Sequence, residues 1–155
     1  MSIANPRLEL VPPPVLFFAV FAVGLAAQHA LTGVWIAPPG PFRAAGAIVA
    51  AAGLCVIFSG AATVLLHGTT IIPHRTPSAL VRRGPFTLTR NPMYVGLTIF
   101  YIGAMLWTGA WAAGPLLIIP VLFMDRVIIP MEERHLREAF GDAYEKYRAA
   151  VRRWI

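Results

Sequence analysis

Long apolar runs dominate the chain up to about residue 130. Four of them, at residues 15–36, 43–66, 93–108 and 112–129, contain few charged side chains. The hydrocarbon core of a bilayer needs roughly 20 apolar residues in a helix to cross it. The pattern therefore predicts four transmembrane helices, with short uncharged turns around Pro39 and Ala110.

The pattern changes after residue 130, where apolar and charged residues alternate at short intervals. A spacing of three or four residues between apolar positions is typical of an amphipathic helix. We therefore expect a helix over residues 131–155 that lies along the membrane interface, with Gly141 as a point of interruption and Arg148, Arg152 and Arg153 near lipid phosphates. The apolar positions are Leu136, Phe140, Tyr144, Tyr147, Val151 and Trp154.

The composition indicates a membrane protein, and the distribution of basic residues predicts its orientation in the membrane. The chain is 57% hydrophobic and 13% charged, whereas a soluble domain is about half apolar and a quarter charged. The predicted fold is one all-α domain, residues 1–155, with four transmembrane helices and the interfacial helix. Basic residues concentrate in the loop 67–91 and after Pro130, so both segments and both termini are expected on the cytoplasmic side of an inner or plasma membrane.

The net charge of +6 fits this topology and contact with anionic headgroups. Basic and aromatic residues are not interleaved as in nucleic-acid-binding proteins, so no nucleic-acid partner is predicted. Cys55 is the lone cysteine, and His67 and His74 lack a third ligand, so no metal is expected. Gln28 and His29 lie inside the first apolar run, where they either bond between helices or line a substrate path.

Ionisable residues occur at the end of the fourth apolar run, where charge is costly and is by default a functional hypothesis. Arg126 and Glu133 are seven residues apart, which places them on nearly the same face of a regular helix. The alternative is a snorkelling arginine and an acidic pair, Glu132 and Glu133, that stabilises a helix start after Pro130.

Two ordered blocks of residues carry a resemblance to a known family. The segment SALVRRGPFTLTRNPMYVG (78–96) is followed by the pair Glu132–Glu133 and then by FGDAYEKY (140–147). This arrangement resembles the isoprenylcysteine carboxyl methyltransferases and, in residues 91–94, also the phospholipid N-methyltransferases. The matching positions are Leu80, Val81, Gly84, Arg90, Pro92, Tyr94 and Gly96, then Glu132, Glu133, Leu136, Phe140, Gly141, Tyr144 and Tyr147.

The resemblance implies a methyltransferase that uses S-adenosylmethionine, bound at the cytoplasmic end of the bundle. Leu80 and Val81 would flank the adenine, and Glu133, or else Glu132, would accept hydrogen bonds from the ribose or the ammonium group. The implied catalytic residues are Glu133 and an arginine four residues before a glutamate. This chain has Ile128 or Ile129 at the arginine position, and Arg126 is the nearest candidate for its role. The implied cofactor-binding residues are Ser78, Leu80, Val81, Phe86, Arg90, Asn91, Pro92, Met93, Tyr94, Glu132 and Glu133.

Three positions depart from the family pattern: Ser78 and Asn91 replace histidines, and Phe86 replaces a tyrosine. Asparagine carries no proton charge, so Asn91 is expected to hold cofactor and not to act as a base. No other base stands out, which mildly favours a carboxylate or thiol acceptor over an amine. Arg126 would then hold a carboxylate bidentately.

The predicted function is methylation of a lipophilic acceptor, either an isoprenylcysteine-like carboxylate or a lipid, that enters from the bilayer. Membrane lipids are its other expected partners. Two alternatives remain open. One is a relative of the membrane sterol and steroid reductases that use NADPH, which are usually larger, and the other is a non-enzymatic membrane interaction protein.

Overall fold

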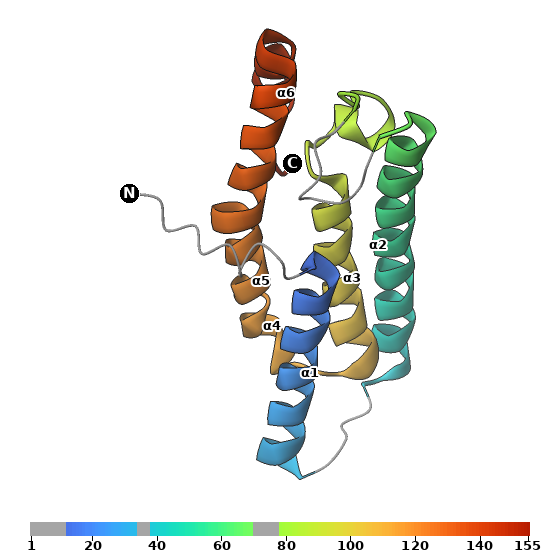
Figure 1. The fold of residues 1–155 in the computed structure, drawn as a ribbon. Coiled ribbons are helices and arrows are strands. Elements are labelled where there is room, and N and C mark those ends of the chain that lie inside the picture. The colour runs from blue at the N-terminus through green and yellow to red at the C-terminus, as the bar shows by residue number, and fades with distance from the viewer. Residues whose placement is uncertain (1–11, 34–37, 70–77) are drawn as a thin grey trace.

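The computed structural model describes residues 12–33, 38–69 and 78–155, and these ranges are helical with no strand (Figure 1). The predicted end of the first run at residues 34–36, and His74 in the loop, lie outside them. The main helices are α1 (Pro13–Thr32), α2 (Gly40–Leu66) and α3 (Pro92–Thr108), with a short 3-10 helix η1 (Gly84–Thr87) before α3. The fourth run and the residues after it form α4 (Ala113–Leu116), α5 (Ile118–Phe123), a π-turn η2 (Met124–Ile128) and α6 (Ile129–Ala150). We call the near-continuous part of this series up to Gly141, where α6 is interrupted, the rod.

Three of these helical segments are long and apolar enough to cross a membrane: α1, α2 and the rod. The α3 helix is apolar but has 17 residues, which corresponds to about 26 Å of helix. The prediction of an all-helical membrane protein is therefore confirmed, and three of the four predicted spans reach full length. The apolar part of the rod holds Asp125 and Arg126 and ends before Glu132.

Close contact between α2 and α3 is made possible by glycine. Gly46, Gly53 and Gly60 recur every seventh residue in α2 and are buried, as are Gly96 and Gly103 in α3. A Cβ atom added at Gly53 would lie 2.5 Å from the backbone nitrogen of Phe100. Small residues at helix contacts are the means by which membrane helices approach closely.

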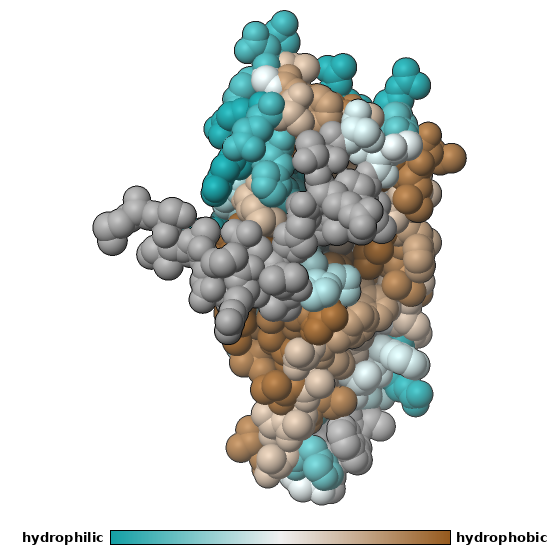
Figure 2. All heavy atoms as spheres, in the orientation of Figure 1, coloured by the Kyte–Doolittle hydropathy of each residue, from teal (hydrophilic) through white to brown (hydrophobic). Residues whose placement is uncertain are grey.

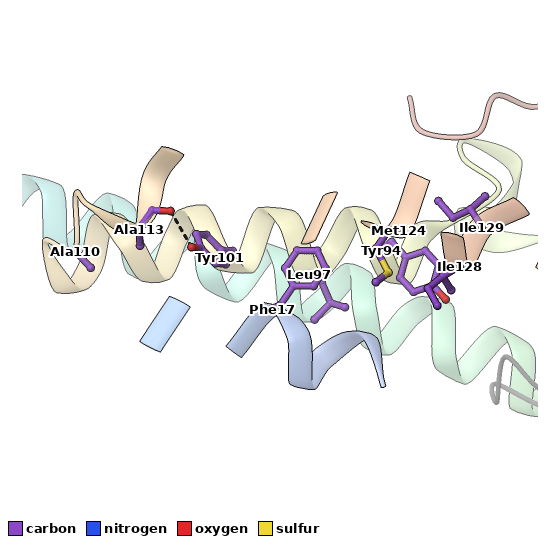
Figure 3. Close-up of a cluster of buried hydrophobic side chains, with 9 residues drawn as sticks. All are labelled: Phe17, Tyr94, Leu97, Tyr101, Ala110, Ala113, Met124, Ile128 and Ile129. Atoms are coloured by element: carbon purple, nitrogen blue, oxygen red, sulfur yellow. Dashed lines mark hydrogen bonds between the residues drawn. The ribbon is translucent and has the colours of Figure 1, made fainter. Parts of the chain in front are cut away.

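The core lies between α1, α3 and the rod (Figure 3). Phe17 from α1 packs against Tyr101 of α3 with the rings 6.4 Å apart. The Tyr101 hydroxyl donates a hydrogen bond of 2.8 Å to the carbonyl of Ala113, which joins α3 to the start of the rod. The nine buried residues of this cluster are Phe17, Tyr94, Leu97, Tyr101, Ala110, Ala113, Met124, Ile128 and Ile129.

Gln28 fixes α1 to the turn between α3 and α4. Its amide nitrogen donates to the Gly109 carbonyl at 2.6 Å, and its amide oxygen accepts from the backbone N–H of Ala112 at 3.1 Å. The side chain is buried. The geometry supports the interhelical interpretation of Gln28, because both ends of its amide already bond to backbone groups.

The segment after residue 130 differs from the predicted single interfacial helix. Gly141 has φ 48° and ψ −125°, which interrupts α6, and the helix ends at Ala150 instead of residue 155. A straight helix would separate Glu133 from Arg153 by about 30 Å, yet their side chains are 2.8 Å apart. The chain therefore reverses at Gly141, where glycine adopts a left-handed φ without a Cβ clash, and returns to the bundle.

Gly53→Ala tests the α2–α3 contact. The new methyl group must push the helices apart, so we expect a loss of about 1–3 kcal/mol in unfolding free energy. The measurement is denaturant or thermal unfolding in detergent. Gly40→Ala is the matched control, because a Cβ at Gly40 meets nothing within 4 Å; equal stability of the two variants would contradict the proposed packing.

Candidate functional site

Hydrophilic side chains gather mainly at one end of the molecule, above a largely hydrophobic body (Figure 2). At that end α6, the loop before α3 and the chain end meet. We call residues 151–155 the strap, because its atoms bond to three separate elements. The site described below consists of the loop residues 89–91, the first turn of α3, Asp125 in η2, the start of α6 and the strap.

Tyr94 and Glu132 form a buried pair. Pro92 opens α3, a position where its missing N–H costs nothing, and so places Tyr94 in the first turn. The Tyr94 hydroxyl donates to Glu132 at 2.6 Å. Burial raises the pKa of the Glu132 carboxyl to about 7, the Tyr94 hydrogen bond opposes the rise, and the negative charge of Glu133 adds to it. Glu132 therefore changes charge near neutral pH.

Glu133 is held by two arginines from distant parts of the sequence. Arg153 donates from Nε and Nη2 to the two carboxylate oxygens at 3.0 and 2.8 Å, which is the bidentate arrangement that arginine favours. Arg90 lies 3.2 Å away on the other side. The side chains of Arg90 and Glu133 are only 11% and 12% exposed, so this ion pair is largely shielded from water.

The strap connects this ion pair to Asp125. Arg153 Nη1 and the indole N–H of Trp154 both donate to the same Asp125 oxygen, at 3.1 and 3.0 Å. The Arg153 carbonyl in turn accepts hydrogen bonds from the side chains of Asn91 and Thr89, at 2.9 and 3.0 Å. The prediction that Arg153 lies near lipid phosphates is therefore wrong, because three carboxylate oxygens occupy its guanidinium.

Two predicted site residues lie apart from this cluster. The Arg126 side chain is 76% exposed, and its ion-pair partner is the neighbouring Asp125 at 3.4 Å. In a regular helix the Pro130 ring would meet the Arg126 carbonyl, and the wider π-turn η2 occurs at this point. Ser78 bonds instead to Gly68 and Thr69 at the end of α2, at 2.9 Å in each case.

The other predicted positions are partly or fully buried. Val81 and Pro92 are buried, and Leu80, Phe86 and Met93 are half-buried. The Phe86 carbonyl accepts a hydrogen bond from Tyr147 at 2.7 Å, and burial raises the pKa of Tyr147 to about 12. Arg90 donates to the Tyr144 hydroxyl at 3.2 Å. Tyr144 and Tyr147 of α6 thus bond to the loop before α3.

Sequence reasoning missed the part played by Asp125, Arg153 and Trp154. Asp125 carried a signal, since it is an acidic residue inside an apolar run. Arg153 and Trp154 carried none, because their partners become neighbours only after the chain reverses at Gly141.

The donors and acceptors of the site fit the polar part of S-adenosylmethionine. Arg90 Nε is buried and has no hydrogen-bond partner, so it can donate to a carboxylate. Glu132 can accept from an ammonium or a ribose hydroxyl. Within the described ranges, His, Cys, Asp and Glu form no group of three able to hold a metal ion.

The fold and the site define a helical membrane protein with a shielded acidic site at one end of its bundle. A sequence model described as "Phospholipid methyltransferase" matches residues 42–143. The chain belongs to this family, which is part of the wider isoprenylcysteine carboxyl methyltransferase-like group, as the motifs predicted. The family indicates a membrane methyltransferase that acts on lipid.

The other comparisons give no further information on the activity. An uncharacterized protein of Haemophilus influenzae is 36% identical over 63 residues, which cover 41% of this chain and all of that protein. No solved structure matches the chain.

Glu133→Gln tests whether the shielded ion pairs stabilise the fold. The substitution leaves Arg90 and Arg153 without their shared counter-charge, so we expect a loss of about 3 kcal/mol in unfolding free energy. Glu145→Gln is the control, since the pairs of Glu145 with Arg137 and Arg148 involve nearly half-exposed side chains and contribute little. The unfolding free energy of both variants is measured by chemical denaturation in detergent. Equal stability of the two variants would refute a stabilising role for Glu133.

Proposed function

We propose that this protein transfers a methyl group from S-adenosylmethionine to the amine of a phospholipid headgroup. The observation that carries the proposal is the buried Tyr94–Glu132 pair, which lies within the residues that the family model matches. Arg90 lies beside it with an unpartnered buried nitrogen. When bound, S-adenosylmethionine supplies a methyl group activated by a sulfonium.

Some residues of the site would bind the cofactor, and others bind and orient neighbouring side chains. Arg90 Nε would bind the carboxylate of the methionyl part, and Glu132 would bind its ammonium or a ribose hydroxyl. Tyr94 orients Glu132 through the 2.6 Å hydrogen bond. Glu133, the first choice from the motif, is engaged by two arginines, and we therefore assign the cofactor contact to Glu132.

The charges of the site support a cationic acceptor. Asp125 and Glu133 pair with Arg90, Arg126 and Arg153, which leaves Glu132 as the one carboxylate of the three without an ion pair. Arg126, the residue predicted to bind a substrate carboxylate, is largely exposed. An amine headgroup carries positive charge near neutral pH and is attracted by such a site. After it loses a proton to water, its neutral nitrogen would attack the methyl carbon as the C–S bond breaks, with S-adenosylhomocysteine as the leaving group.

Binding of S-adenosylhomocysteine, measured by calorimetry on detergent-purified protein, tests the cofactor site. Glu132→Gln removes a charge-assisted hydrogen bond of about 1.5–3 kcal/mol, so we expect the Kd to rise tenfold or more. Tyr94→Phe is expected to weaken binding less. Arg126→Gln, on an exposed side chain, is the control and should bind as the wild type does. No binding by the wild type, or binding of NADPH in its place, would rule the proposal out.

The pH dependence of the same titration follows from the raised pKa of Glu132. Below pH 7 the carboxyl is protonated in the free protein, and binding a cationic group requires it to lose that proton. Affinity should therefore fall by about tenfold for each pH unit below 7 and level off above it. Glu132→Gln should flatten the profile around pH 7, and an unchanged profile in this variant would show that another group titrates.

Transfer of a radiolabelled methyl group identifies the acceptor. Vesicles containing phosphatidylethanolamine are expected to be methylated, and an isoprenylcysteine derivative in the same vesicles is expected to remain unlabelled. Labelling of the isoprenylcysteine alone would support methyltransferase activity but contradict the proposed phospholipid acceptor.

A further inference from the structure

The strap bonds to three parts of the site: the loop 89–91, Asp125 in η2 and Glu133 at the start of α6. Its backbone runs extended beside the loop before α3, where the N–H of Arg90 donates to the Arg152 carbonyl at 2.9 Å. The Arg153 carbonyl accepts from Thr89 and Asn91. Asn91 immediately precedes α3, and Tyr94 lies in its first turn. The strap backbone thereby fixes the side of the site that carries Tyr94.

The Arg153 side chain fixes the opposite side. Its guanidinium binds both oxygens of Glu133 in α6 and one oxygen of Asp125 in η2. Glu133 adjoins Glu132 in sequence, so the backbone that carries Glu132 is tied to the same guanidinium. Trp154 adds a second donor to Asp125. One residue therefore contacts the loop through its carbonyl and the rod through its side chain.

We infer that Arg153 is a positioning residue of the cofactor site, and that the strap holds Tyr94 and Glu132 at the separation that cofactor binding requires. This inference rests on the proposed function. The strap lies beyond residue 143, where the family match ends, so the match itself assigns it no role. Arginine suits this position because its planar fork can bond two carboxylates at once, whereas lysine presents a single point charge.

Arg153 also affects the charge around Glu132. The negative charge of Glu133 raises the pKa of Glu132, and Arg153 partly compensates for Glu133. Removal of the Arg153 charge should therefore move the pH at which Glu132 ionises upward, while a lysine should leave it in place. The groups that act directly on Glu132 are Tyr94 from α3 and Glu133 from α6. Glu133 in turn pairs with Arg90 from the loop and Arg153 from the strap, and Arg153 pairs with Asp125 from η2.

The test compares Arg153→Gln and Arg153→Lys with Arg152→Gln by calorimetric titration with S-adenosylhomocysteine from pH 6 to 9. Arg152 is the matched control, because its side chain is exposed and its strap contact is made by the backbone carbonyl. We expect Arg153→Gln to weaken binding about tenfold and to move the pH midpoint above 7. Arg153→Lys should weaken binding by a smaller factor and keep the midpoint, and Arg152→Gln should match the wild type.

A second measurement is independent of cofactor. Thermal unfolding of Arg153→Gln, Glu133→Gln and the double variant should show that the two losses are not additive, because both remove the same contact. Additive losses would overturn the inference, and Arg153→Lys, which keeps the charge, provides a folded variant if Arg153→Gln does not fold.

The outcomes separate this inference from the proposed function. If the wild type binds S-adenosylhomocysteine and both Arg153→Gln and Arg153→Lys bind it equally well, the positioning role of Arg153 is overturned. The proposed function is then unaffected. Failure of the wild type to bind S-adenosylhomocysteine would overturn the proposed function and this role with it, even where the unfolding data show that the Arg153–Glu133 contact exists.

Discussion

The ion-pair network around Glu133 is the interaction on which the site depends. It brings together Arg90 from the loop, Glu133 from α6 and Arg153 from the strap, 63 positions from first to last. A largely buried carboxylate is unstable without compensating charge, and here two guanidinium groups supply it. Because each arginine also bonds elsewhere, the network fixes the loop, the rod and the strap relative to one another.

The same network leaves Glu132 in a different electrostatic environment from Glu133. Glu133 is neutralised by arginines, whereas the hydrogen bond to Glu132 comes from a neutral phenol, Tyr94. Burial without a cation raises the pKa of Glu132 to about 7. Two adjacent glutamates of the same sequence motif thus differ in environment, because Glu133 is paired with arginines and Glu132 is bonded to a neutral phenol.

The hydrophobic part of the molecule determines where this site can form. Glycines in α2 and α3 allow the two helices to approach at backbone distance, and Gln28 and Tyr101 fix α1 and the rod to the α3–α4 turn. These contacts lie along the apolar body, where only internal hydrogen bonds satisfy backbone groups. The charged residues are thereby concentrated at one end, beside the first turn of α3.

The amino-acid sequence by itself determined the class of fold, the approximate position of each helix and the family, because apolar runs and ordered motifs are local properties. It also identified Arg90, Asn91, Tyr94, Glu132 and Glu133 as one group, which the structure brings together. Tertiary structure alone decided the rest. Arg126 lies exposed in the π-turn before Pro130, and the reversal at Gly141 placed Arg153 against Glu133 and Asp125. Hydrophobic periodicity assumes a regular helix, and both decisions occur where the backbone leaves that geometry.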